Sequence, residues 1–278
     1  MVTGPDRRRG RGSSTSPTPV KQAAVELGIP TSERVVDVVG SGAELGLVVA
    51  FGRLVRPEVL ARVPMVNVHF SLLPRWRGAA PVERAMLAGD TETGVSIMAL
   101  EEGLDTGPVF ATARTEIGVE ESADELRGRL GEMGTTLVLE LLALGLDGLG
   151  GAVAQRGEAT YASKLAASEL ELDWSASAQH CHRVVRVGRA WTTFRGRRLV
   201  VRRAAMAPRA DGGPDGTGTA VPGSLHGRLV TTGDGLLELR EVQPEGRAPL
   251  AFESWALGAR PVPGELLGPV RSGGAGHG

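Results

Sequence analysis

The sequence predicts an α/β domain with an open, mostly parallel sheet, followed by a small all-β domain. Up to about residue 150, apolar strand-like runs alternate with helical patterns, which favours a sheet covered by helices. Beyond that point, short strand patterns separated by glycine-rich turns dominate, which is typical of a small barrel or sandwich. No apolar run approaches the roughly 18 residues of a membrane span, so a globular chain is expected.

The elements of the first part follow from apolar periodicity and from capping residues. Residues 1–18 are basic, then rich in Ser, Thr and Pro, and are expected to form a loop. The long helical pattern that starts after Ser122 opens with a capping box, in which the side chains of Ser122 and Glu125 are expected to bond each other's backbone amides. Strands are expected in 45–51, 65–70, 94–101 and 108–117, and helices in 19–28, 56–63, 81–90 and 122–149.

The second part contains four strand-rich stretches after a polar connector. A turn with the sequence Gly-Asp-Gly at 233–235 is expected to join two of them as a hairpin. The stretches are 190–196, 198–206, 223–233 and 235–244.

Charge is distributed unevenly along the chain. Residues 181–278 contain 14 arginines and 8 acidic residues, a net charge of +6, whereas the remainder carries −7. The segment 181–203 alone contains eight arginines and no acidic residue. Such a surface suits a polyanion such as nucleic acid, although a merely solvated arginine-rich face would have the same composition. The single cysteine, Cys181, excludes an intramolecular disulfide and a cysteine-rich zinc site, and a cytoplasmic protein is expected.

Asn67 and His69 are the first candidates for chemistry. In the strand-like run MVNVHF they lie on one face, while Val66, Val68 and Phe70 lie on the other. Polar residues in a covered sheet are tolerated mainly at the carboxyl end of a strand, where ligands bind. A core histidine hydrogen-bonded to a neighbour is the alternative explanation.

Asp105, in EEGLDTGPV, is the second candidate. An isolated aspartate between two strands is most often a turn residue that accepts backbone hydrogen bonds. It gains a catalytic role if its strand lies beside that of His69, because a carboxylate fixes the tautomer of an imidazole and favours its charged form.

Two other patterns do not predict sites. VVGSGAELG resembles a dinucleotide-binding loop, but its glycine spacing differs from G-x-G-x-x-G. The run His180-Cys181-His182 has no partner motif, and adjacent residues of a helix face different ways, so no metal site is expected.

NVHFSLLPRWRGAAP together with GLDTG resembles the methionyl-tRNA formyltransferase family. PDRRRGRG, ATYASKL, LDW and AWTTFRGRRL are similar to that family in the same order, so the resemblance covers essentially the whole chain. It implies formyl transfer from 10-formyltetrahydrofolate to the methionine amine of initiator methionyl-tRNA. We expect a monomer without a metal. The Asn-x-His and SLLP elements are shared with other formyltransferases, while the basic GRG loop and the C-terminal region point to the tRNA enzyme.

The resemblance also implies roles for individual residues. Asn67, His69 and Asp105 match the catalytic trio of the family. Four residues match its folate-binding element: Ser71, Leu72, Leu73 and Pro74. The residues expected to bind tRNA are Arg7, Arg11, Arg195, Arg197 and Arg198.

The implied architecture is a Rossmann-like formyltransferase domain over residues 1–155 and an OB-like, tRNA-binding β-barrel over 181–270. Residues 156–180 are expected to form a linker and residues 271–278 a disordered tail. The chain departs from the family pattern at its start, where roughly one βα unit is expected to be missing, and in a shortened stretch before Ala190-Trp191.

Two other functions stay open at the level of the sequence. One is formyl transfer to a sugar nucleotide or a purine precursor, against which the arginine-rich C-terminal half argues. The other is a tRNA-binding protein without catalysis, against which the presence of Asn67, His69 and Asp105 argues.

Overall fold

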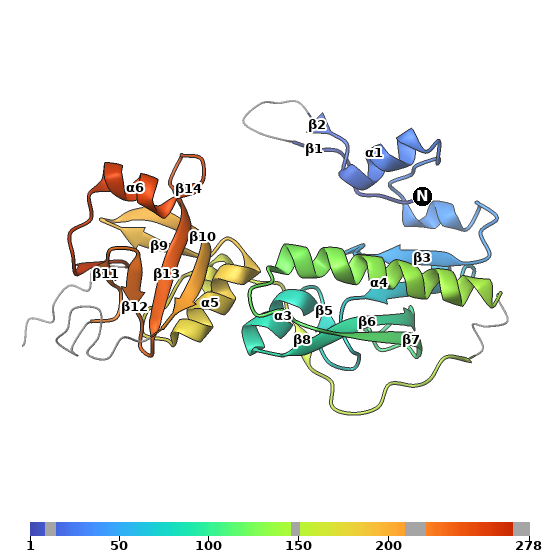
Figure 1. Ribbon diagram of the computed structural model, residues 1–278. Coiled ribbons are helices and arrows are strands. Elements are labelled where there is room, and N and C mark those ends of the chain that lie inside the picture. The colour runs from blue at the N-terminus through green and yellow to red at the C-terminus, as the bar shows by residue number, and fades with distance from the viewer. Residues whose placement is uncertain (9–14, 146–150, 209–220, 269–278) are drawn as a thin grey trace, which may run out of the picture. The chain divides into compact units, whose positions relative to one another are not determined.

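The computed structural model describes residues 1–8, 15–145, 151–208 and 221–268 (Figure 1). The chain divides into two compact units. The first comprises Met1–Ala79, Gly94–Arg114 and Gly131–Tyr161, and the second comprises Ala80–Thr93, Thr115–Leu130 and Ala162–Gly278.

The helices and strands in the first part of the chain follow the predicted order. They are β1 (Arg7–Arg8), β2 (Thr15–Ser16), α1 (Pro19–Glu26), η1 (Val35–Val38), β3 (Gly46–Val49), α2 (Pro57–Leu60), β4 (Met65–His69), β5 (Arg77–Gly78), α3 (Pro81–Ala88), β6 (Glu92–Ala99), β7 (Val109–Glu116) and α4 (Ala123–Ala143). The predicted capping box is confirmed, since the Ser122 hydroxyl and the Glu125 carboxylate bond each other's backbone amides at the start of α4. Helix α3 begins at Pro81 and is terminated after Ala88 by Gly89, whose φ of 82° lies in the left-handed region.

The central sheet has the strand order β3-β4-β6-β7. Strands β3 and β4 are parallel, and β4 and β6 are antiparallel, so within the described residues the sheet is mixed and its predicted parallel character applies to β3–β4. The connection between β6 and β7 is too short for the crossover that parallel neighbours need, so these two strands are antiparallel as well. The predicted loop at the N-terminus differs too, because β1 and β2 form a short antiparallel pair there.

The second part of the chain is a nearly closed antiparallel barrel. Strand β8 (Tyr161–Ala162), which precedes the barrel, pairs with β5 in a separate two-stranded sheet. The elements that follow it are η3 (Ala167–Leu170), α5 (Ala178–Val187), β9 (Trp191–Phe194), β10 (Arg197–Ala207), β11 (Ser224–His226), β12 (Leu229–Thr231), β13 (Leu236–Pro244), β14 (Leu250–Ala251), α6 (Phe252–Ala259) and β15 (Glu265–Leu266). The strands run in the order β15-β11-β12-β13-β10-β9. A bridge between Phe194 and Leu267 brings the two ends of this sheet together. The prediction of an α/β domain followed by a small barrel is therefore confirmed.

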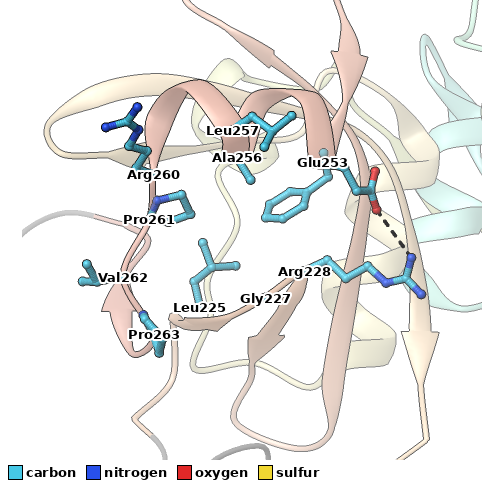
Figure 2. A pocket seen from close by; sticks show the side chains of 11 residues that line it. Leu225, Gly227, Arg228, Glu253, Ala256, Leu257, Arg260, Pro261, Val262 and Pro263 are labelled. Carbon is cyan, nitrogen blue, oxygen red and sulfur yellow. Dashed lines mark hydrogen bonds and ion pairs between the residues drawn. The ribbon is translucent and has the colours of Figure 1, made fainter.

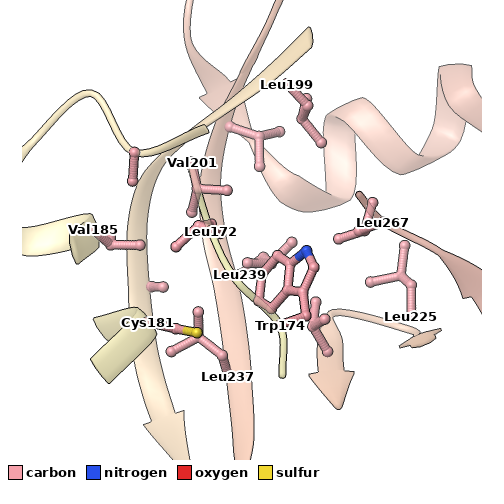
Figure 3. Packing of buried hydrophobic residues seen from close by; sticks show 14 of the residues in the cluster. Leu172, Trp174, Cys181, Val185, Leu199, Val201, Leu225, Leu237, Leu239 and Leu267 are labelled. Carbon is pink, nitrogen blue, oxygen red and sulfur yellow. The ribbon is translucent and has the colours of Figure 1, made fainter. Parts of the chain in front are cut away.

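The core of the barrel is apolar and dense (Figure 3). Leu237 and Leu239 of β13 and Val201 of β10 are fully buried in it, beside Cys181 of α5. Trp174 fills the same core and satisfies its indole nitrogen by donating to the Thr192 hydroxyl at 3.0 Å. Buried Leu199 and Val201 alternate with more exposed neighbours in the first half of β10, but the alternation breaks after Val201, where the register with β13 shifts.

Candidate active site

Strand β4 presents its two polar residues on one face of the sheet. Val68, on the opposite face, lies under α4 at a point where a Cβ on Gly134 would come within 2.7 Å of it. The helix therefore covers the Val68 face closely, and Asn67 and His69 point away from it, as their alternation requires. Asn67 is half-buried and His69 is 5% exposed.

Asp105 is brought next to His69, as its predicted role requires. The Asp105 Oδ2 atom lies 3.7 Å from His69 Nδ1 and accepts a hydrogen bond from the Gly78 amide at 2.8 Å. On the other side of the ring, His69 Nε2 donates to the Trp76 carbonyl oxygen at 2.8 Å. The imidazole is therefore held from both nitrogens by the segment 76–78 and by Asp105.

These contacts fix which nitrogen of His69 carries a proton. A carbonyl oxygen only accepts, so Nε2 must be the donor to Trp76. Nδ1 is then the nitrogen that faces the carboxylate, and a second proton there would turn the contact into an ion pair. The arrangement can accommodate an imidazolium without moving either side chain.

The SLLP segment forms a tight turn directly after β4. Ser71 is fully buried, and its hydroxyl donates to the Arg75 carbonyl, while Ser96 of β6 bonds both the Ser71 carbonyl and the Leu73 amide. The peptide bond between Leu73 and Pro74 is cis. Leu72 and Pro74 are half-buried.

A cavity of about 360 Å³ lies beside this turn. Leu73 is the SLLP residue that lines it, together with residues from β7 and from the segment after α4. These are Val109, Phe110, Ala111, Thr112, Val153, Ala154, Gln155 and Arg156. The structure thus brings one of the four predicted folate residues to an open cavity of mixed polarity.

The arginines predicted to bind tRNA differ in their surroundings. Arg11 lies outside the described residues, and Arg7 is described through its backbone in β1. Arg195 is engaged within the barrel, where it donates to the Glu265 carboxylate at 2.6 Å and to the Ala259 carbonyl. Arg197 is exposed on β10, and the exposed Arg198 lies over the Trp191 ring at 4.3 Å. Arg197 and Arg198 are therefore better placed than Arg195 to meet an anion.

A second cavity, of about 690 Å³, lies on the barrel between α6 and β11 (Figure 2). Its lining is mostly apolar, including Leu225, Ala256, Leu257 and Val262. Its Arg228 is paired with Glu253 at 3.4 Å, so the charge of this arginine is compensated. It contains none of the predicted site residues.

Neither a metal cluster nor a membrane helix is found in the part of the chain that the structure describes. No group of three or more His, Cys, Asp or Glu side chains in the described ranges could hold a metal ion. No helix among the same residues is long and apolar enough to cross a membrane.

Known proteins similar to this chain share both parts of it. The family model for Formyl transferase matches residues 1–142, and that for Formyl transferase, C-terminal domain, matches residues 164–260. The methionyl-tRNA formyltransferase of Jannaschia sp. is 39% identical over 279 residues, which cover 95% of this chain and 89% of that protein. The chain belongs to the methionyl-tRNA formyltransferase family. The relative from Paracoccus denitrificans is 41% identical over 88% of this chain and 84% of its own length.

Members of this family are enzymes that use a tetrahydrofolate-derived formyl donor. Among solved structures, HypX from Aquifex aeolicus in complex with tetrahydrofolic acid has a TM-score of 0.61 and 16% identity. The match covers 84% of this chain and 43% of HypX, and at this identity it shows the fold alone.

Sequence reasoning missed the backbone groups that hold the site. The Trp76 carbonyl and the Gly78 amide contact His69 and Asp105, yet neither belongs to a residue type that predicts chemistry. Gln155 was also missed, although it lies close to Asp105 in space. For Trp76 and Gly78, the sequence signal was their position shortly after the SLLP motif of the family.

Proposed function

We propose that this chain transfers the formyl group of 10-formyltetrahydrofolate to the amino group of methionine on initiator methionyl-tRNA. The observation that carries the proposal is the buried His69–Asp105 pair beside Asn67 at the end of β4. It is supported by 39% identity to a methionyl-tRNA formyltransferase over 95% of the chain. A cytoplasmic location and a monomeric state remain predictions from the sequence.

The reaction requires a neutral amine and a stabilised oxyanion. A free α-amine has a pKa near ~8, so roughly a tenth of it is neutral and able to attack at pH 7. Its nitrogen attacks the formyl carbon, a new C–N bond forms, and the carbonyl electron pair moves to the oxygen. Collapse of this tetrahedral intermediate breaks the bond to N10 of the folate, which takes up a proton, while the amine loses one.

Asn67 and His69 are the donors suited to the oxyanion. Both point to the same face of β4, and the side-chain amide of Asn67 can donate without a change of protonation state. His69 Nε2 already donates to Trp76, so we propose that the formyl oxygen replaces that carbonyl as its acceptor. Loss of one such donor typically costs about 10²–10³ in rate.

Asp105 is the group suited to stabilise positive charge on His69 as the proton of the amine is passed on. Its Oδ2 faces His69 Nδ1 at 3.7 Å and is held there by the Gly78 amide. General acid–base assistance of this kind contributes about 10²–10⁴ in rate.

The acceptor would be held through its phosphates by exposed arginines. Segment 181–203 contains eight arginines and no acidic residue, and Arg197 and Arg198 are exposed there. Arg186 is used differently, since it donates to the Gly118 carbonyl at 2.6 Å. We assign tRNA contact to Arg197 and Arg198, together with Arg11 of the N-terminal basic segment.

The test is formylation of initiator methionyl-tRNA by the purified chain with 10-formyltetrahydrofolate as donor. We expect turnover by the unmodified protein and none above background for His69→Ala, while the control His180→Ala, at an exposed position on α5, keeps its rate. Near-normal turnover by His69→Ala would overturn the assignment of His69. Turnover with a sugar nucleotide amine and none with tRNA would establish the rival acceptor class.

The same assay separates the binding roles. Arg11→Ala is expected to raise the KM for tRNA far more than the KM for the folate donor. Equal effects on both would remove Arg11 from the acceptor site. Tight tRNA binding without any turnover would favour the non-catalytic alternative.

A further inference from the structure

The segment from Val153 to Thr160 connects the two loops that hold His69 and Asp105. At one end, Val153 pairs with Val109, directly after the loop that contains Asp105, through two backbone hydrogen bonds of 2.8 Å. At the other end, the Thr160 hydroxyl and carbonyl accept from the amides of Trp76 and Arg77. Both loops that contact His69 are therefore tied to one stretch of chain.

Gln155 lies in this segment and uses its whole side-chain amide. Its Nε2 donates to the Asp105 carbonyl at 2.9 Å and to the Gly107 carbonyl at 2.8 Å. Its Oε1 accepts from Arg77 Nε at 3.1 Å and from a terminal nitrogen of the same guanidinium at 2.6 Å. A guanidinium has only donors and a carbonyl only accepts, so the orientation of the Gln155 amide is unambiguous.

The backbone that Gln155 holds is in an unusual conformation. Asp105 has a φ of 50°, in the left-handed region, which aspartate adopts more often than most residues other than glycine but still at a cost. At Gly107, a Cβ would come within 2.0 Å of the Ala99 carbonyl oxygen, so this loop passes close against the end of β6. Contacts from outside the loop must offset the cost of the Asp105 conformation, which is of order 1–3 kcal/mol for such residues.

Arg77 links the same amide to the opposite side of the imidazole. Its neighbour Trp76 supplies the carbonyl that accepts from His69 Nε2, and its other neighbour, Gly78, donates to Asp105 Oδ2. The hydrogen bonds from Arg77 to Gln155 and from Gln155 to Asp105 thus connect one side of the His69 ring to the other.

We propose that Gln155 is a positioning residue for formyl transfer, which orients the Asp105 carboxylate towards His69 by holding the backbone carbonyls of Asp105 and Gly107 with its amide. The proposal rests on the proposed function of the His69–Asp105 pair. Gln155 also lines the cavity beside Leu73, so a role in contacting the folate donor is the competing explanation. The two explanations differ in which kinetic constant changes.

Gln155→Glu separates them, because it keeps the length of the side chain and an acceptor for Arg77 but removes both donors to the carbonyls. If Gln155 positions Asp105, kcat falls by roughly 10- to 100-fold, the size expected when a catalytic group is misplaced by about an ångström. The KM values for donor and tRNA change by less than about threefold. A rise in the KM for the donor with kcat unchanged would overturn the proposal in favour of direct contact.

The matched control is Gln243→Glu on β13, which removes the amide donor to the Arg247 carbonyl far from His69 in sequence and should leave kcat within about twofold. If Gln155→Glu does not fold, judged by its thermal transition, Gln155→Met takes its place as an uncharged side chain of the same length. The same fall in kcat is expected of it, and an unchanged kcat would overturn the proposal.

A double-mutant cycle with Asp105→Asn tests whether Gln155 acts through Asp105. Because both substitutions impair the same contact, adding Gln155→Glu to Asp105→Asn should lower kcat by less than about threefold more. Fully multiplicative effects would show that Gln155 acts independently of Asp105 and would overturn the proposal. No turnover by the unmodified protein would instead defeat the proposed function, so the two failures are distinguishable.

Discussion

Replacing Asp105 by asparagine removes its charge and little else. The asparagine oxygen can still accept from the Gly78 amide, which now bonds Asp105 Oδ2 at 2.8 Å. Asparagine also tolerates the φ of 50° at this position better than alanine would. The substitution therefore tests whether the carboxylate charge stabilises an imidazolium at His69.

The distance between the two side chains sets the expected size of the effect. For unit charges 3.7 Å apart, Coulomb's law gives about 4.5 kcal/mol at an effective dielectric constant of about 20 and about 1.1 kcal/mol at about 80. At 1.36 kcal/mol per factor of ten, the rate should fall between about 7-fold and about 2,000-fold. Both side chains are nearly buried, so we expect a fall of roughly 10²–10³.

The measurement is kcat/KM for formylation of initiator methionyl-tRNA, with the thermal transition recorded for each protein. Asp37→Asn is the matched control, because its exposed carboxylate also accepts one hydrogen bond, from the Ser32 hydroxyl. We expect the control to stay within twofold of the unmodified protein. A rate for Asp105→Asn within twofold as well would refute a role for the charge.

Three further predictions concern the barrel. Burial raises the pKa of the Cys181 thiol to about 12, so a thiol reagent at pH 8 should label it only after denaturation, and fast labelling of the native protein would contradict this. Burial lowers the pKa of His182, against the raising effect of Glu120, so below pH ~6.5 the unfolded chain binds more protons than the folded chain. The stability of the protein should therefore decrease as the pH is lowered below ~6.5. The thermal transition of His182→Asn should depend less steeply on pH in this range. Leu237→Ala should lower the free energy of unfolding by about 2–5 kcal/mol in denaturant titrations, and a loss below 1 kcal/mol would argue against the tight packing around Leu237.

Features set by neighbouring residues were predictable from the sequence. The helix that begins after Ser122 carries its own capping box, and the helix over 81–88 has proline at its start and glycine at its end. Asn67 and His69 could be assigned to one face of a strand because side chains alternate with a period of two. The hairpin turn at 233–235 followed from its glycines in the same way, and Thr232 and Gly235 bond across it.

Features set by distant residues were not predictable. Strand β5 pairs with β8, more than 80 residues further along the chain, and nothing in the two short sequences indicates the pairing. The contact between Asp105 and His69 could be stated only as a condition, because it depends on the loop after β6 returning to the end of β4. The hydrogen bonds of Gln155 depend on the same folding back of the loop after β6 and on the path of the segment after α4. Nothing in the local sequence around Gln155 therefore predicts its contacts.

The two strained residues of the first unit's site are also the two that act on His69. Trp76 has a φ of 61° and Asp105 a φ of 50°, and neither is a glycine. Each supplies one atom to the imidazole, a carbonyl oxygen to Nε2 and a carboxylate oxygen to Nδ1. Such conformations persist only where the surroundings hold them, and here Thr160 bonds the Trp76 amide while Gln155 bonds the Asp105 carbonyl. Because the restraint comes from hydrogen bonds outside the catalytic trio, the orientation of His69 is fixed before a substrate arrives. The reorganisation that the proposed mechanism then requires at His69 is the exchange of the Trp76 carbonyl for the formyl oxygen as the acceptor of Nε2.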